Sequence, residues 1–254
     1  MIQNFVNIRK FGKEFKLLSF SKKIGIVDPP EYISMEKDKN QGESLADQVE
    51  AAARALFAKA RTSHDWDHTQ RVIALARRIG EAEGADQEVV VMAACLHDIG
   101  RARQDASNGS ICHAQKGAEM AAPLLQELGL PPNKAENILH CIRAHRFRKG
   151  EAPETLEAKV LFDADKLDSI GAIGVARAFA FAGEVGARLH SPGKDPFKSK
   201  PYTEDDTGFR EFEVKLKKVK ERMQTREGKR IAGKRHAFMT AFFARFLAEY
   251  EGLK

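Results

Sequence analysis

The chain has 254 residues, of which 43% are hydrophobic and 31% charged, and its net charge is +6. This composition is ordinary for a globular protein, and a chain of this length buries a core without disulfides, so we expect one large domain or one domain with appendages. No apolar stretch approaches the ~20 residues of a membrane span, and Lys and Arg interrupt the apolar N-terminus, so we expect neither a membrane protein nor a secretory signal but a cytoplasmic location.

The first 42 residues differ in pattern from the rest and are predicted to form an N-terminal extension or linker. Their apolar residues are scattered, and Asp28-Pro29-Pro30 interrupts any helix. The polar run 37–42, KDKNQG, is typical of a linker. We therefore place the boundary of the main domain at residue 43.

Helical periodicity begins at Ser44 and continues to Gly84 in two segments with apolar residues at three-to-four spacing. A third helix is predicted from Asp86 to His97. It is apolar on nearly all sides, which indicates a central buried helix. The glycine that follows, Gly100, fits a helix end.

Further helices are predicted at 114–128, 132–146 and 155–182, followed by a loop at 191–208 rich in Pro, Gly and Asp. Two long helices, 209–226 and 229–250, complete the chain. No strand-like alternation is seen, so the fold class is all-α. We assign 43–190 to the main domain and 191–254 to a loop and C-terminal helices that pack on it.

Two further features of composition have plain interpretations. Cys95, Cys112 and Cys141 are an odd number without close spacing, which predicts reduced thiols and not a disulfide framework or a zinc site. Residues 209–254 contain 13 Lys and Arg against 6 Asp and Glu. We interpret this excess as a solvated basic helix face and expect no nucleic-acid partner, because no nucleic-acid motif accompanies it.

The adjacent pair His97-Asp98 ends the most apolar helix of the chain. Burial of an imidazole and a carboxylate costs several kcal/mol unless a partner compensates them. A divalent cation is such a partner, because it binds both donor types and keeps the aspartate ionised. His68 at the start of the preceding helix and Asp165 in the acidic word DADKLD complete a set of two His and two Asp, although a lone His or Asp at a helix start also serves as a cap.

The ordered set His68, His97-Asp98 and Asp165 resembles the HD superfamily of metal-dependent phosphohydrolases. The surrounding words match as well: His64-Asp65-Trp66-Asp67-His68 with Arg71-Val72, Leu96-His97-Asp98-Ile99-Gly100, Asp163-Ala164-Asp165-Lys166-Leu167-Asp168, Gly171-Ala172-Ile173-Gly174 and Ala176-Arg177. The resemblance covers about 44–185. Within the superfamily, the motifs are similar to those of a bacterial subgroup related to nucleotide pyrophosphatases.

The resemblance implies an all-helical HD-domain bundle with additional C-terminal helices. It implies a divalent metal, Mn²⁺ or Mg²⁺, with Fe, Co, Ni or Zn as alternatives, held by His68, His97, Asp98 and Asp165. It also implies hydrolysis of a phosphate ester or anhydride. We predict a nucleoside triphosphate cut to monophosphate and pyrophosphate, with nucleoside monophosphates, cyclic dinucleotides and alarmones as alternatives.

His113 and His145 lie between the His-Asp pair and the last Asp, where some HD proteins bind a second metal. These two histidines could bind a second ion, or they could form hydrogen bonds to the substrate phosphate next to a single ion. A capping role is the structural alternative, because His145 ends a predicted helix. We predict a single metal, with both histidines on the substrate.

Three basic residues near the motifs are candidate phosphate ligands. Arg101 follows Gly100, where many HD proteins have Lys, and Lys166 adjoins Asp165. A guanidinium binds phosphate through its fork and an ammonium as a point charge. Asp98, Arg101 and Lys166 are therefore the predicted catalytic residues, and Arg71 is a further candidate for substrate binding; solvent-facing or ion-paired roles are the alternatives.

The remaining candidates have supporting or packing roles. Asp168 and Ser169 are candidate hydrogen-bond partners of the ligands, and His64 and Asp67 could orient His68. Trp66 is interpreted as core cover. We expect six phenylalanines to form a core stripe, not a base-stacking platform: Phe179, Phe181, Phe238, Phe242, Phe243 and Phe246.

Two rival functions remain open at this point. One is a di-iron oxygenase, which some HD proteins have become and which needs iron at a second metal position. The other is a nucleotide-sensing or nucleic-acid-binding module that has lost catalysis, and the intact ligand set argues against it. A homodimer is also open.

Overall fold

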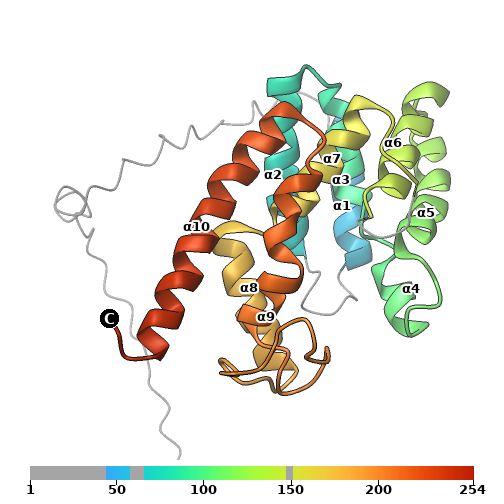
Figure 1. The fold of residues 1–254 in the computed structure, drawn as a ribbon. Coiled ribbons are helices and arrows are strands. Elements are labelled where there is room, and N and C mark those ends of the chain that lie inside the picture. The colour runs from blue at the N-terminus through green and yellow to red at the C-terminus, as the bar shows by residue number, and fades with distance from the viewer. Residues whose placement is uncertain (1–43, 58–65, 147–150) are drawn as a thin grey trace, which may run out of the picture. The chain divides into compact units, whose positions relative to one another are not determined.

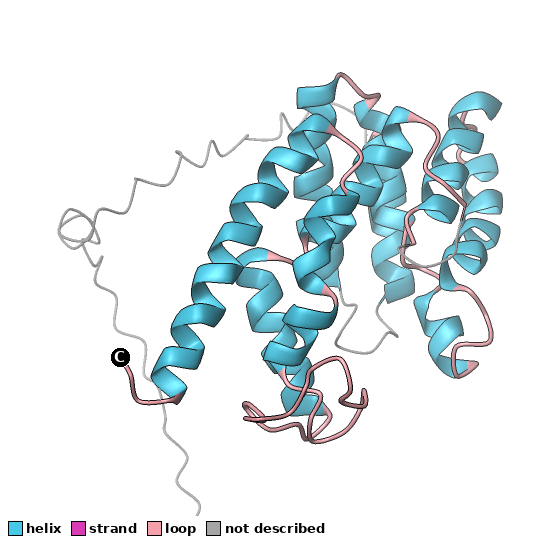
Figure 2. Cartoon of the chain, in the orientation of Figure 1, coloured by secondary structure: helices cyan, strands magenta, loops and turns pink. Residues whose placement is uncertain are grey.

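The computed structural model describes residues 44–57, 66–146 and 151–254, and Glu43–Lys254 form one compact unit. Figure 1 and Figure 2 show this unit as packed helices joined by loops, with no strand in the described ranges. The predicted all-α class is therefore confirmed. No helix within these ranges is long and apolar enough to cross a bilayer.

The helices lie close to the ranges that periodicity predicts, with differences discussed below. In chain order they are α1 (Leu45–Phe57), α2 (Trp66–Glu83), α3 (Gln87–Leu96), α4 (Arg101–Ala106), α5 (His113–Glu127), α6 (Pro132–Ala144), α7 (Leu156–Leu167), α8 (Gly171–Glu184), α9 (Gly208–Val214), the 3-10 helix η4 (Leu216–Arg222) and α10 (Arg226–Tyr250).

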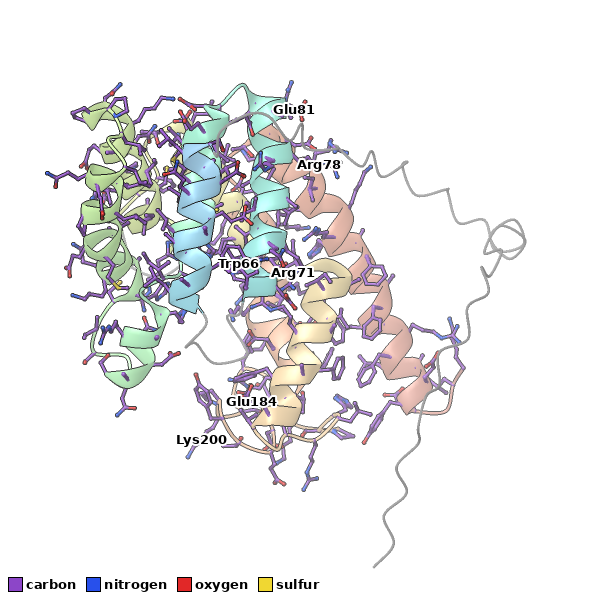
Figure 3. The ribbon with its side chains drawn as sticks, turned by 180° about the vertical axis from the view of Figure 1, so that it is seen from behind. Trp66, Arg71, Arg78, Glu81, Glu184 and Lys200 are labelled. Atoms are coloured by element: carbon purple, nitrogen blue, oxygen red, sulfur yellow. The ribbon has the colours of Figure 1, made fainter. Side chains whose placement is uncertain are left out.

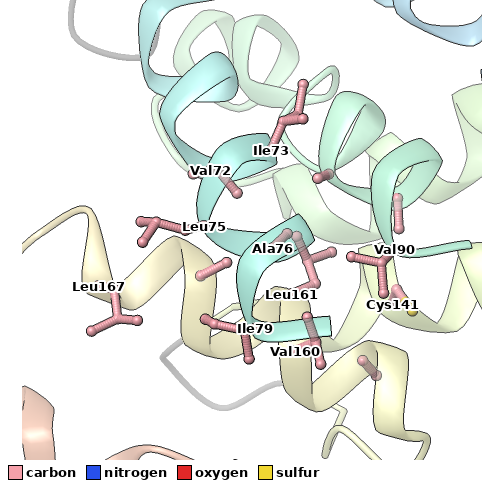
Figure 4. Close-up of a cluster of buried hydrophobic side chains, with 14 of the residues drawn as sticks. Val72, Ile73, Leu75, Ala76, Ile79, Val90, Cys141, Val160, Leu161 and Leu167 are labelled. Carbon is pink, nitrogen blue, oxygen red and sulfur yellow. The ribbon is translucent and has the colours of Figure 1, made fainter. Parts of the chain in front are cut away.

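Helix α3 is the centre of the core, as its sequence predicts. The carboxylate of Asp86 accepts hydrogen bonds from the N–H groups of Glu88 and Val89 at 3.0 and 3.3 Å and so caps the helix. Every residue from 89 to 96 is buried, and α1, α2, α6 and α7 pack around the helix. Figure 4 shows part of this core, where Val90 lies among side chains of the surrounding helices. The rigid core fixes the position of the polar residues that follow α3.

Two predicted helices are each divided in the structure. The range 155–182 contains α7 and α8, separated near Asp168, and α8 begins at Gly171, whose φ of +81° favours glycine. The range 209–226 contains α9 and η4, because the backbone at Lys215 leaves helical geometry with φ −134°. The short helix α4 was not predicted from the sequence.

The N-terminus of α10 is anchored on α7 by Asp163. This buried carboxylate accepts hydrogen bonds from the N–H of Gln224 at 2.8 Å and from the N–H and hydroxyl of Thr225 at 2.8 and 2.7 Å. Thr225 in turn caps α10 through the N–H of Gly228. Helix α10 packs against α2, α7 and α8 (Figure 1), so the C-terminal helices belong to the same unit as the helix that contains Asp165.

The predicted phenylalanine stripe is only partly a core. Phe243 is buried and stacks on Phe212 with ring centroids 4.5 Å apart, and Phe179 packs against it. Phe181 and Phe238 are 36% and 48% exposed, so their assignment to the core was wrong. Both lie on helix faces turned from the packed side, which helical spacing alone does not distinguish.

Gly100 lies where the turn after α3 meets the start of α5. A Cβ atom at this position would lie 2.2 Å from the carbonyl oxygen of His113 and 2.6 Å from the backbone nitrogen of Gly117. Because both atoms belong to the backbone, a Gly100→Ala change has to displace α5. We expect a loss of about 1–3 kcal/mol in the free energy of unfolding, measured by urea denaturation.

Gly183 provides a matched control in an exposed position of α8. A Cβ there meets nothing within 4 Å, so Gly183→Ala is expected to stabilise the protein by about 0.5–1 kcal/mol. A Gly100→Ala protein as stable as the control would show that the approach of α5 to the turn is not tight.

Candidate metal centre

Six predicted side chains come together at the ends of five helices. His68 lies in the first turn of α2, His97 and Asp98 directly follow α3, and Asp165 lies in the last turn of α7. His113 begins α5, and His145 directly follows α6. Four histidines and Asp98 are at most 4% exposed, and the side chain of Asp165 is 15% exposed. The structure therefore brings together candidates that lie in separate motifs of the sequence.

His68, His97 and Asp165 form the first of two ligand groups. The Nε2 atom of His68 lies 3.4 Å from Nε2 of His97 and 3.4 Å from Oδ1 of Asp165. One donor atom from each residue falls within 4.8 Å of the others. Nitrogens that bind one Zn²⁺ at about 2.0–2.1 Å in a tetrahedron lie roughly 3.3 Å apart, so these separations fit one shared ion.

Asp98, His113 and His145 form the second group. The Nε2 atoms of His113 and His145 are 3.2 Å apart, and they lie 3.4 and 3.6 Å from Oδ1 of Asp98. The other oxygen of Asp98, Oδ2, lies 3.8 Å from Nε2 of His97. The carboxylate of Asp98 thus stands between the two groups and faces both.

The outer nitrogen of every histidine is held by an oxygen acceptor. The Nδ1 atoms of His97 and His145 lie 2.7 and 2.6 Å from the carbonyl oxygens of Ala94 and Ile142, three residues earlier on the same helix. The Nδ1 atoms of His68 and His113 lie 2.8 Å from side-chain oxygens, Oδ2 of Asp168 and Oε1 of Gln104. Each acceptor favours a proton on Nδ1, so Nε2 is the nitrogen directed at the centre and can bind a metal once it carries no proton.

This arrangement fits a cation. Lone pairs that face one another at 3.2–3.4 Å repel unless a positive charge lies between them, and two carboxylates stand beside them. A divalent ion accepts imidazole nitrogen and carboxylate oxygen together. The chemistry of the donor set therefore supports a metal that HD proteins bind.

Burial and neighbouring charges shift the pKa values of the ligand candidates. Burial alone would lower the pKa of His68, but hydrogen bonds to Asp165 and Asp168 outweigh it and raise the pKa to about 9. Burial lowers the pKa of His97 to about 4. Burial would raise the pKa of Asp165, but the charge of Lys166 and the contact with His68 hold it well below its usual range. Asp165 and His97 therefore stay in the forms that bind a metal.

The two predicted catalytic cations contact the ligand carboxylates. The NH2 group of Arg101 donates to both oxygens of Asp98 at 3.2 and 3.3 Å. The ammonium of Lys166 donates to Oδ2 of Asp165 at 2.6 Å and lies over the ring of Phe162. Because they contact Asp98 and Asp165, both side chains border the centre, and they are 18% and 13% exposed.

Arg71 and Asp168 contact each other beside the first ligand group. The guanidinium of Arg71 donates through Nε and NH2 to the two oxygens of Asp168 at 2.7 and 3.1 Å. Ser169 donates to the carbonyl oxygen of Lys166 at the end of α7. Asp67 is exposed in the first turn of α2, and His64 lies outside the described residues.

Gln104 is a supporting residue that sequence reasoning missed. Its side-chain oxygen accepts from the ring and lies 3.3 Å from the backbone nitrogen of His113. It belongs to α4, whose six residues are too few to show a periodic pattern. Its place six residues after Asp98 is the only signal that could have indicated it.

Comparison with known proteins gives the family. The model of the HD domain matches residues 65–170, which include all six ligand candidates. A Bacillus subtilis strain 168 protein designated YpgQ is 30% identical over 213 residues, which are 82% of this chain and 95% of YpgQ. This chain belongs to the HD domain family.

Crystal structures of HD proteins have the same fold over most of their length. That of Bacillus subtilis YpgQ in complex with ADP matches with a TM-score of 0.63 and 31% identity, over 80% of this chain and 93% of the YpgQ chain. That of an HD-superfamily hydrolase from Bacillus thuringiensis matches with a TM-score of 0.65 and 30% identity, over 81% of this chain and 96% of its own. These matches extend well beyond the HD-domain range, so the C-terminal helices are part of the shared fold.

Proposed function

We propose that this HD protein is a metal-dependent phosphohydrolase that cleaves a nucleoside triphosphate to monophosphate and pyrophosphate. The observation that carries the proposal is the convergence of six buried ligand-type side chains beside two cations, Arg101 and Lys166. A centre that combines a metal with basic side chains is suited to phosphate chemistry. The ADP complex of the similar YpgQ supports a nucleotide as the substrate.

The proposal assigns the metal to four residues: His68, His97, Asp98 and Asp165. When bound, a divalent ion there would polarise phosphate oxygens and lower the pKa of a nearby water, which would supply hydroxide at neutral pH. Asp98 stands between the two ligand groups, where its carboxylate is placed to accept a proton from the attacking water. The ends of α2, α3 and α7 would together hold the ion, and the proton acceptor lies at the end of α3.

The basic side chains complete the proposed mechanism. Water forms a bond to the α-phosphorus, the bond from that phosphorus to the bridging oxygen breaks, and pyrophosphate leaves with the electron pair. Arg101 and Lys166 are placed to stabilise the negative charge that grows on the phosphate oxygens during this exchange. His113 and His145 would hold the phosphate on the opposite side of Asp98.

The products distinguish this reaction from other hydrolyses. Protein freed of metal by chelation and reloaded with Mn²⁺ or Mg²⁺ is expected to convert a nucleoside triphosphate to monophosphate and pyrophosphate in equal amounts, measured by ion-exchange chromatography. Chelation should reduce the rate to background, and the metal should restore it. Diphosphate and inorganic phosphate as products would contradict the cleavage site, and no turnover with any divalent metal would contradict the activity.

A further inference from the structure

We propose that Asp168 is a positioning residue for the metal centre, and that Arg71 and Arg177 hold its carboxylate against His68. This inference rests on the proposed metal-dependent function, which it extends to residues that do not touch the metal. It concerns the region where α2, the end of α7 and α8 meet; Figure 3 shows Arg71 at this end of α2.

The carboxylate of Asp168 is almost fully enclosed by donors. Its side chain is 1% exposed, and its Oδ2 atom accepts from Nδ1 of His68 at 2.8 Å and from NH1 of Arg177 at 2.7 Å. Arg71 donates to both oxygens. These donors come from two helices, α2 and α8, so the carboxylate is fixed from two directions.

The contact with His68 decides which ring nitrogen faces the metal ligands. An imidazole that rotates by half a turn exchanges the places of its two nitrogens. Because Asp168 accepts from Nδ1, Nε2 is directed at Asp165 and His97, 3.4 Å from each. A carboxylate behind a ligating histidine also raises the basicity of the ligand. Asp168 therefore acts through His68 without reaching the centre itself.

The arginines explain why a buried carboxylate is stable in this position. A single imidazole would leave a buried charge poorly compensated, and such a charge costs several kcal/mol. Two guanidinium groups supply the missing charge and use both oxygens. Arg71 thereby directs its Nε and NH2 groups at Asp168, which favours a positioning role over the substrate contact predicted for it from the sequence.

Helix α7 offers a matched control for the charge of Asp168. Asp163 is also a buried carboxylate of this segment, but it faces α10 and contacts Thr225 and not His68. Asp168→Asn and Asp163→Asn each remove one negative charge close to Asp165. Only the first removes a carboxylate that lies behind a ligand and leaves a neutral, weaker acceptor there, so the difference between the two isolates the positioning effect.

The test is titration of metal-free full-length protein with Mn²⁺ by calorimetry. Asp168→Asn is expected to weaken Mn²⁺ binding about 10- to 100-fold relative to the wild type, as loss of such partners does in other metal sites. Asp163→Asn is expected to weaken it by a few-fold at most. At saturating Mn²⁺ the Asp168→Asn protein should regain kcat with an unchanged KM for nucleotide.

The Arg177→Gln variant separates the positioning effect from a purely electrostatic one, because the two change the affinity for Mn²⁺ in opposite directions. Its side chain is 32% exposed, so the variant is expected to fold. Loss of a positive charge near a cation strengthens metal binding by electrostatics alone, whereas loss of the hold on Asp168 weakens it, which we expect several-fold. Tighter Mn²⁺ binding by Arg177→Gln, or equal binding by Asp168→Asn and Asp163→Asn, would overturn the inference alone. A wild-type protein that binds no Mn²⁺ would overturn it together with the proposed function.

Discussion

An Asp98→Ala protein is expected to lose hydrolysis, by more than about 100-fold in kcat, while its helices remain folded. Partners that only orient metal ligands contribute 10- to 100-fold, and a ligand that also accepts the proton should contribute more. Asp98 is the carboxylate that both ligand groups share, with contacts to His97, His113 and His145. Its removal therefore disturbs the whole centre, and His97→Ala is expected to act in the same way.

The fold should tolerate the Asp98 change because α3 is held by its apolar residues and by Asp86, not by Asp98. Circular dichroism and metal content measure the two effects separately. Asp206→Ala is a matched control, since Asp206 is a buried carboxylate paired with Arg210 at 2.7 Å in a different part of the fold. That variant should lose stability and retain activity. Full activity in Asp98→Ala would contradict the assignment of the centre.

The central helix could be predicted because its pattern is independent of context. A run that is apolar on all sides has to be buried, and an aspartate before it supplies the cap. The division between α7 and α8 could not be predicted in this way, because apolar residues continue through 155–182. Besides the positive φ of Gly171, distant contacts hold the break: Arg235 of α10 donates to the carbonyl oxygen of Leu167, and its side chain packs on Gly171.

The ligand candidates were identifiable by their order in the chain, and the structure brings all six together. Their hydrogen-bond partners were less visible. His97 and His145 use backbone carbonyl oxygens, which no side chain marks in a sequence. Gln104 lies on a helix too short to predict. The orientation of the rings, which directs each Nε2 to the centre, therefore could not be predicted from the sequence.

The number of metal ions is a separate question, on which we expect one tightly bound ion per chain. The observation that favours one is the charge around His113. Burial lowers its pKa, the charge of Asp98 opposes this shift, and the smaller effects of the charges of Arg101 and Arg146 add to it. Arg101 also donates to both oxygens of Asp98, the only carboxylate of the second group. These two guanidinium groups weaken the attraction of the Asp98 carboxylate for a second cation and favour phosphate at this position.

A His113→Gln/His145→Gln protein tests this expectation. If both histidines bind phosphate, the variant should retain one equivalent of metal and lose about 100-fold or more in kcat/KM, because two contacts to the charged group are lost at once. Metal content by plasma mass spectrometry and steady-state kinetics give the two values on the same preparation. Glutamine retains a polar side chain of similar length, so the cavity is not emptied.

The outcome that contradicts a single ion is equally specific. An active wild-type protein with two equivalents of metal, falling to one in the double variant, would place a second ion between Asp98, His113 and His145. The facing Nε2 atoms, 3.2 Å apart, repel each other while both carry lone pairs, and either a metal ion or a proton removes that repulsion. With one metal, a proton taken up together with the phosphate would have to reach Nε2 of one histidine before that ring could donate to the phosphate, because burial lowers the pKa of His113. With two metals the pair is a ligand set, and Arg101 would have to release Asp98 before the second ion could bind.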